Sequence, residues 1–89
     1  IGDIFPNPFN PIVNMHYNIS QFGPIEIHIY DLNGRMVNTL VNDYKQPGRY
    51  SAYWNGLDQY NHPVSSGIYL LVLESNQEVP QTRKLILLK

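Results

Sequence analysis

Apolar and polar residues alternate with a period of two along most of this chain. Within residues 12–19 the apolar positions are Val13, Met15, Tyr17 and Ile19. Every second side chain of a strand points to the same face, so this period is typical of a strand that is buried on one face. The alternation recurs in residues 25–32 and 49–54, and no window shows the apolar stripe of an amphipathic helix. The sequence therefore predicts an all-β fold.

Turn signals separate the alternating segments. Asn33-Gly34 accepts positive φ at both residues, which predicts a two-residue hairpin turn between residues 25–32 and 35–41. The chain has 89 residues, of which 43% are hydrophobic, so we expect one small globular domain.

Later turn signals complete the predicted order of strands. Residues 42–48 predict a loop, in which Pro47 and Gly48 suit a type II turn. The longest irregular stretch is 55–66, with a very short strand expected at 62–65. Two more strands are predicted at 68–75 and 82–88. Six or seven strands of this spacing favour a β-sandwich.

Proline dominates the start of the chain. Three prolines between positions 6 and 11 restrict the backbone to extended conformations. We expect residues 1–11 to form a Pro-rich leader that packs on the sandwich, and residues 12–89 to form the sandwich itself. The sequence begins without Met or a signal peptide, so a module of a larger protein is expected.

Composition excludes several function classes. The formal net charge is −1, which is far from the basic surface that nucleic-acid binding requires. The chain contains no cysteine, which excludes disulfides, thiolate metal sites and a Cys nucleophile. The longest apolar run, residues 68–73, is far shorter than the roughly 20 residues of a membrane-spanning helix. We expect neither a nucleic-acid partner nor a membrane span.

The last two predicted strands are apolar on both faces. Residues 68–73 and 85–88 carry apolar side chains at both parities, whereas a sandwich strand needs only one. Either parity of residues 68–73, with alternate residues of the last strand, is expected to form an outward apolar patch, and such patches often mark docking sites. Cover by the leader or by the long loop is the alternative.

No catalytic or metal-binding motif is visible. His16, His28 and His62 are not spaced as zinc ligands, and the first two fall on the polar, solvated parity of their strands. Asp58 and His62, with Ser65 and Ser66, lack the nucleophile elbow of a hydrolase, so turn chemistry explains them better. We expect no catalytic residue, no resident metal and no cofactor.

Two weaker binding hypotheses remain open. Asn55, Asp58 and Asn61 offer oxygen ligands for a loop calcium ion, but with a single carboxylate. Trp54 is expected in the core and Tyr53 at the surface. Outward aromatic rings of this kind leave a carbohydrate-binding module as an alternative.

Six motifs, in this order, resemble a known family. They are Pro6-Asn7-Pro8-Phe9-Asn10-Pro11; Ile29-Tyr30-Asp31-Leu32-Asn33-Gly34-Arg35-Met36-Val37; Pro47-Gly48; Trp54-Asn55-Gly56; Pro63-Val64-Ser65-Ser66-Gly67-Ile68-Tyr69; and Thr82-Arg83-Lys84-Leu85-Ile86-Leu87-Leu88-Lys89. Together they look like the type A C-terminal sorting domain of the type IX secretion system, which is itself similar to the Ig-like domain of flagellar hook-capping proteins. The resemblance runs nearly end to end and implies a single Ig-like antiparallel β-sandwich of about seven strands.

The resemblance also implies a function. Such a domain is a non-catalytic signal that directs a larger upstream cargo through the periplasm to the outer-membrane surface or the medium. Its implied partners are the outer-membrane type IX translocon, a β-barrel shuttle and, in many cargos, a sortase-like protease. The alternative is an accessory β-sandwich, either a spacer or a carbohydrate-binding module, of a secreted multidomain hydrolase.

The resemblance places recognition towards the C-terminal end of the chain. The residues concerned are Gly67, Tyr69, Thr82, Arg83, Lys84, Leu85, Ile86, Leu87, Leu88 and Lys89. We expect a partner to combine edge-strand pairing, apolar contact and charge steering there, and we expect the same edge to allow self-association. The sequence departs from the family pattern at Asn55, where Asp is frequent, and in residues 57–63, where a Gly is common.

Overall fold

The computed structural model describes residues 4–6, 12–76 and 78–88, and in these residues the chain forms seven strands and no helix. The strands are β1 (Ile4–Pro6), β2 (Val13–Ile19), β3 (Gly23–Asp31), β4 (Met36–Lys45), β5 (Gly48–Trp54), β6 (Gly67–Ser75) and β7 (Gln81–Leu87). The predicted all-β fold is confirmed. Within the described ranges no helix is long and apolar enough to cross a membrane.

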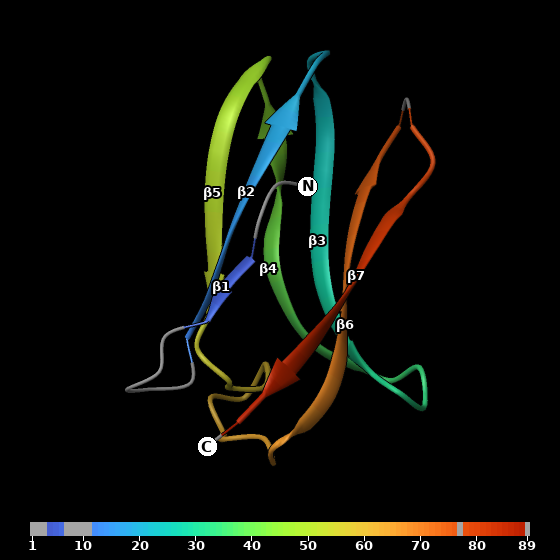
Figure 1. The fold of residues 1–89 in the computed structure, drawn as a ribbon. Helices are drawn as coiled ribbons and strands as arrows, with labels where there is room; N and C mark the ends of the chain where they lie inside the picture. The colour runs from blue at the N-terminus through green and yellow to red at the C-terminus, as the bar shows by residue number, and fades with distance from the viewer. Residues whose placement is uncertain (1–3, 7–11, 77, 89) are drawn as a thin grey trace.

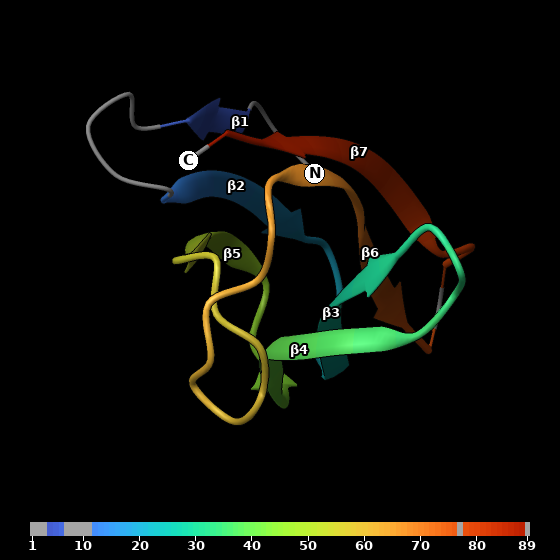
Figure 2. The same ribbon diagram turned by 90° about the horizontal axis from the view of Figure 1, so that it is seen from below.

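The strands form two antiparallel sheets that pack face to face (Figure 1). One sheet has the order β1-β2-β5 and the other the order β4-β3-β6-β7. The connections at residues 20–22, 46–47 and 55–66 each carry the chain from one sheet to the other, as the view from below shows (Figure 2). This exchange between layers makes the domain a sandwich, as the turn spacing predicts.

The core lies between the two sheets and consists of the inward-facing residues of both. Its members are Val13, Met15, Tyr17, Ile19, Ile25, Ile27, Ile29, Trp54, Tyr69, Leu71, Leu73, Leu85 and Leu87. Trp54 of β5 and Tyr69 of β6 meet edge to face, with ring centroids 5.1 Å apart, so this aromatic pair joins the two sheets. Trp54 is buried and Tyr53 is exposed, as the alternation of β5 predicts.

The β3–β4 hairpin forms as predicted, but its turn is longer by one residue. The Asp31 amide donates to the Arg35 carbonyl at 2.9 Å and the Gly34 amide to the Asp31 carbonyl at 3.1 Å. Gly34 has φ of 85°, whereas Asn33 does not have a positive φ. The prediction of a two-residue turn is therefore wrong. The loop has three residues and ends on a left-handed glycine, a common hairpin in which only that glycine needs positive φ.

β4 continues into the segment predicted as a loop. Residues 42–45 pair with β3 as far as Gly23, which lies opposite Lys45. The turn to β5 is therefore confined to Gln46 and Pro47. Gly48 has φ of 156°, far from the roughly +80° of a type II turn, so the predicted turn type is also wrong.

The connection from β5 to β6 is held by hydrogen bonds rather than by strand pairing. The strand predicted at 62–65 is wrong, since only a single bridge forms here, between Leu57 and Pro63. The Leu57 carbonyl accepts hydrogen bonds from Trp54 Nε1 and Asn38 Nδ2, both at 2.9 Å. These two bonds fix the connection to β5 and β4.

Part of the predicted leader is a strand. β1 pairs antiparallel with β2, with Ile4 opposite Met15 and Pro6 opposite Val13. The remaining leader positions, residues 1–3 and 7–11, lie outside the described residues.

Candidate functional site

The predicted recognition segment forms an edge of the four-stranded sheet. β7 pairs antiparallel with β6, with Gly67 opposite Leu87 and Tyr69 opposite Leu85. Among the strands that the structure describes, β7 has no second pairing partner. One line of backbone donors and acceptors on β7 is therefore directed away from the sheet, as in any edge strand.

The side chains of this segment divide into a buried set and an exposed set. Leu85 and Leu87 are each 2% exposed and belong to the core. The exposed set consists of Thr82, Arg83, Lys84, Ile86 and Leu88. The predicted residues on β7 thus have two roles. The buried leucines attach the strand to the core, and the exposed set is accessible to a partner. Lys89 lies outside the described residues.

Tyr69 supports the fold from inside rather than from the surface. Its hydroxyl donates a hydrogen bond to the Ser65 carbonyl at 2.6 Å, and its ring packs on Trp54. A buried tyrosine that ties back to the chain four residues upstream fixes the entry into β6, as in the tyrosine corner of sandwich domains. Among the described residues, a Cβ placed on Gly67 would meet only the Tyr69 ring, at 4.0 Å.

The outward face of β6 and β7 carries an apolar patch. Ile68 and Ile86 lie directly opposite each other and are 40% and 57% exposed. Leu70, next along this face, is half-buried and lies opposite Lys84. In residues 68–73, the side chains that share the parity of Ile68 therefore face outward. The described residues, including the long β5–β6 connection, leave the isoleucine pair accessible.

The carboxylate of the loop between β5 and β6 binds its own backbone. Asp58 Oδ1 accepts hydrogen bonds from the amides of Tyr60 at 2.8 Å and His62 at 3.0 Å. The His62 amide is the main reason that the pKa of Asp58 is lowered, although desolvation opposes it. Asn55 Oδ1 similarly accepts from the Leu57 amide at 3.3 Å. This arrangement is that of side-chain-capped turns.

The three histidines lie in separate places. His16 on β2 and His62 in the loop are exposed, but His28 on β3 is 7% exposed, so the prediction that it is solvated is wrong. Its ring packs against Tyr30 and against Thr39 of β4. The polar parity of β3 is covered by neighbours in a way that the sequence of β3 alone does not reveal.

The exposed aromatic rings of residues 12–76 and 78–88 lie at separate places on the domain. Tyr53 lies on β5 and Tyr60 in the β5–β6 connection. Phe22 and Tyr44 stack on each other, with ring centroids 5.8 Å apart. Trp54 is buried and is unavailable to a sugar. A sugar-binding face needs rings that share an exposed plane, and this arrangement does not favour one.

Comparisons with known proteins identify the family. The chain matches the family described as secretion system C-terminal sorting domain over residues 3–88. Its fold is similar to part of the crystal structure of dimeric latent PorU from Porphyromonas gingivalis, with a TM-score of 0.69 and 20% sequence identity. That similarity covers 94% of this chain and 9% of the PorU chain, so this chain spans a small part of that protein's length. A search of the curated proteins found no match.

The family match extends over nearly the whole chain and agrees with the motifs in the sequence. The PorU structure, at this identity, supports the fold alone. Members of the matched family are sorting signals for type IX secretion, and the family is generally non-catalytic. On this evidence, the chain belongs to the family of secretion system C-terminal sorting domains.

Proposed function

We propose that this domain is the export signal of a larger cargo protein and that the type IX translocon recognises the outward side of β7. The observation that supports β7 as the recognised strand is that its exposed set lies on an edge strand. Lys84 lies on the same face as exposed Ile86, and Arg83 is exposed next to it, on a strand whose second backbone edge pairs with no other described strand. A partner can bind such a strand by adding a strand of its own, by covering the isoleucine, and by presenting acidic groups.

The proposed route follows from the family. The cargo is attached upstream of the domain and crosses the periplasm with the domain folded. The outer-membrane translocon and a β-barrel shuttle then bind β7, and a sortase-like protease acts on the domain as its substrate. The domain itself supplies no reacting group, and the cargo is delivered to the cell surface or the medium.

A secretion assay tests this proposal. Residues 1–89 are fused to a Sec-exported fluorescent reporter and expressed in matched strains with and without the type IX translocon. We expect the reporter to reach the surface or the medium only in the strain that has the translocon. Retention of the folded fusion in the periplasm of both strains would favour an accessory spacer module instead.

Variants within the same assay test the choice of β7. The double substitution Lys84→Ser and Ile86→Ser changes two exposed side chains of β7, and we expect it to reduce translocon-dependent export about tenfold or more, as loss of a central contact does in other interfaces. The matched control is Arg49→Ser with Tyr53→Ser, two exposed positions on β5 in the other sheet. Equal export of both double variants, each with the wild-type unfolding midpoint, would exclude β7 as the recognised strand.

A further inference from the structure

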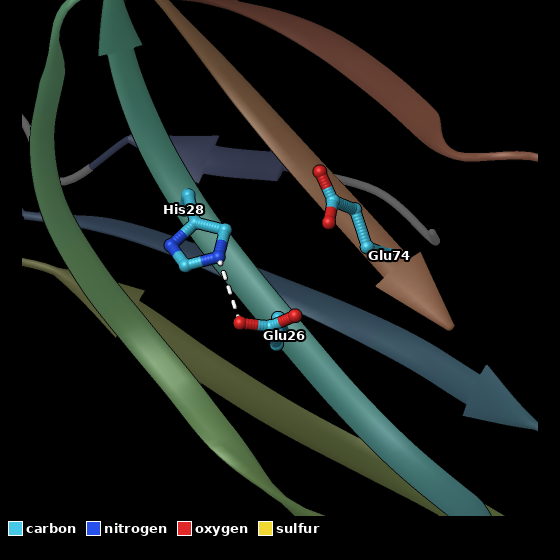
Figure 3. A group of neighbouring side chains, drawn as sticks. All are labelled: Glu26, His28 and Glu74. Atoms are coloured by element: carbon cyan, nitrogen blue, oxygen red, sulfur yellow. Dashed lines mark ion pairs between the residues drawn. The ribbon is translucent and has the colours of Figure 1, made fainter. Parts of the chain in front are cut away.

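Three side chains with metal-ligating atoms converge on the outward face of the four-stranded sheet. They are Glu26 and His28 of β3 and Glu74 of β6 (Figure 3). One ligand atom from each residue lies within 4.8 Å of those of the other two. This cluster is separate from the exposed set on β7 and has no part in the proposed recognition.

The backbone of the sheet creates this convergence. Glu26 and His28 are two residues apart on one strand, so both point to the same face. Glu74 lies directly opposite Glu26 in the pairing of β3 with β6. Two ligands at i and i+2 on one strand and a third on its neighbour form a three-point site on a rigid surface, which is the kind of support that a metal site needs.

Among the residues that the structure describes, the two carboxylates have no lysine or arginine partner. Like charges that are directly opposite in a sheet are destabilising. No lysine or arginine makes an ion pair with Glu26 or Glu74 within residues 4–6, 12–76 and 78–88. His28 Nε2 lies 3.4 Å from Glu26 Oε1, and this contact is an ion pair only when the imidazole is protonated. The neutral imidazole that binds a metal leaves the negative charge of both carboxylates uncompensated.

The surroundings of His28 orient its ring for metal binding. His28 Nδ1 lies 2.9 Å from Thr39 Oγ1, and that hydroxyl donates to Met36 Sδ at 3.5 Å. Metal binding through Nε2 requires the tautomer with the proton on Nδ1, and the threonine hydroxyl oxygen is placed to accept a hydrogen bond from that proton. Nε2 then has its lone pair directed towards the carboxylates. A second hydrogen bond of this type is how metal-ligating histidines are usually held.

We propose that Glu26, His28 and Glu74 bind one divalent transition-metal ion, with Zn²⁺ as the best fit. A neutral imidazole with two carboxylates offers one nitrogen and two oxygens, a set that suits Zn²⁺ and is poor for Ca²⁺ or Mg²⁺. The charge of −2 on the two carboxylates balances the dication. Ligands about 2 Å from one Zn²⁺ lie about 3.3 Å apart, and rotation of the two glutamate side chains supplies the remaining contraction.

The bound metal would join the two central strands of the sheet. β3 and β6 pair with each other, and β6 in turn carries β7. An ion held by side chains from both strands binds the folded chain and not the unfolded one, so it stabilises the sheet by mass action. This effect does not depend on recognition by the secretion machinery.

Calorimetric titration of the metal-free chain with ZnCl₂ tests the proposal. We expect one Zn²⁺ per chain and an unfolding temperature that rises with Zn²⁺ concentration. Glu74→Gln preserves the shape of the side chain and removes the charge of one ligand. We expect this variant to bind Zn²⁺ at least about tenfold more weakly than the wild type. The matched control is Glu78→Gln, which changes an exposed carboxylate outside the cluster and should bind as the wild type does.

Two further readouts identify the ligands. In NMR spectra of the imidazole nitrogens, Zn²⁺ should shift the His28 signals and leave those of His16 and His62 unchanged. Millimolar Ca²⁺ should not compete with Zn²⁺, because it does not favour a nitrogen ligand. Absence of saturable Zn²⁺ binding, equal affinity of Glu74→Gln and the wild type, or shifts confined to His16 or His62 would each overturn the proposal.

Discussion

The backbone carbonyl of Leu57 connects the two sheets through side-chain hydrogen bonds. It accepts one hydrogen bond from the indole of Trp54 and one from the amide side chain of Asn38. Both lone pairs of this oxygen are therefore used, and the two donors come from different sheets. The backbone amide of Gln59 donates a third hydrogen bond, to the Val37 carbonyl at 2.9 Å. A connection that makes no regular strand thus has its backbone groups satisfied by specific partners.

Asp31 has the same kind of role in the β3–β4 hairpin. Its Oδ1 accepts from the amides of Asn33 at 2.9 Å and Arg35 at 3.0 Å, while Oδ2 accepts from Arg35 Nε at 3.2 Å. The hydrogen bond from the Arg35 amide is the main reason that the pKa of Asp31 is lowered; desolvation opposes it, and the Arg35 side chain adds to the lowering. The ionised carboxylate therefore favours the turn.

A pH dependence of stability follows from this lowered pKa. Between the folded-state and unfolded-state pKa values the unfolded chain binds more protons, so the free energy of unfolding falls as the pH falls. The contribution of Asp31 is complete above the unfolded-state pKa of about 3.9 and is lost as the pH falls through the lower, folded-state pKa. Urea unfolding from about pH 5 to pH 2 should show a shallower loss of stability for Asp31→Asn than for the wild type.

Arg35→Ala is the control for this experiment. It removes the guanidinium but keeps the Arg35 amide, the largest cause of the lowered pKa of Asp31. We expect most of the wild-type pH dependence to remain. If Arg35→Ala flattened the profile as much as Asp31→Asn, the guanidinium and not the turn amides would control this carboxylate.

Strand β4 shows where sequence periodicity succeeds and where it ends. The strand was predictable as the partner of β3, because a hairpin signal precedes it. The pattern of its buried side chains was not, because the pairing contains irregularities between Ile27 and His28 and between Ile29 and Tyr30 of β3. At each irregularity β4 has one extra residue, which shifts its side-chain parity. Val37, Leu40 and Val41 all pack against the core for this reason, and no single period describes them.

The candidate sites were predictable to different degrees. β7 is a candidate from the sequence alone because its residues are contiguous and carry a family motif. Glu26 and His28 have an i, i+2 spacing in the sequence, but they form neither a histidine pair nor a zinc-motif spacing. Glu74 joins them only through the pairing of β3 with β6. Strands this far apart in the chain pair through packing, which the local pattern does not specify.

Buried and exposed residues of β7 should respond differently to truncation. Leu87→Ala removes a core side chain and should lower the free energy of unfolding by about 2–5 kcal/mol. Ile86→Thr keeps a β-branched side chain on the exposed face and should change it by less than about 1 kcal/mol. Urea unfolding of both variants checks this. Equal destabilisation would mean that the outward face of β7 also packs against part of the protein.

At the scale of the whole molecule, the edge of β7 also offers a surface for a second copy. We propose that two β7 strands can pair antiparallel and so extend the sheet across two molecules. Arg83 and Lys84 would then bring like charges together, and this repulsion is screened by salt. Charged residues, lysine above all, are a common means of protecting an edge strand from such pairing.

Sedimentation measures this balance. The average mass should rise as NaCl is increased from about 20 mM to about 500 mM, because the Debye length shrinks. Lys84→Gln should raise the mass at low salt, whereas Lys45→Gln, a change at the lysine that lies over the Tyr50 ring, should not. A monomer at every salt concentration in all three proteins would exclude pairing through β7.

The strand order of the four-stranded sheet has a consequence for the timing of export. β6 pairs with β3 across all of β4, β5 and the long connection, and β7 pairs only with β6 among the described strands. Closing such a distant pair makes folding slow, and β7 has no position in the sheet until that pair exists. A newly made chain therefore displays no ordered signal strand while it is incomplete. A partner that reads β7 as a strand would select finished molecules, so the fold acts as a kinetic checkpoint on its own export.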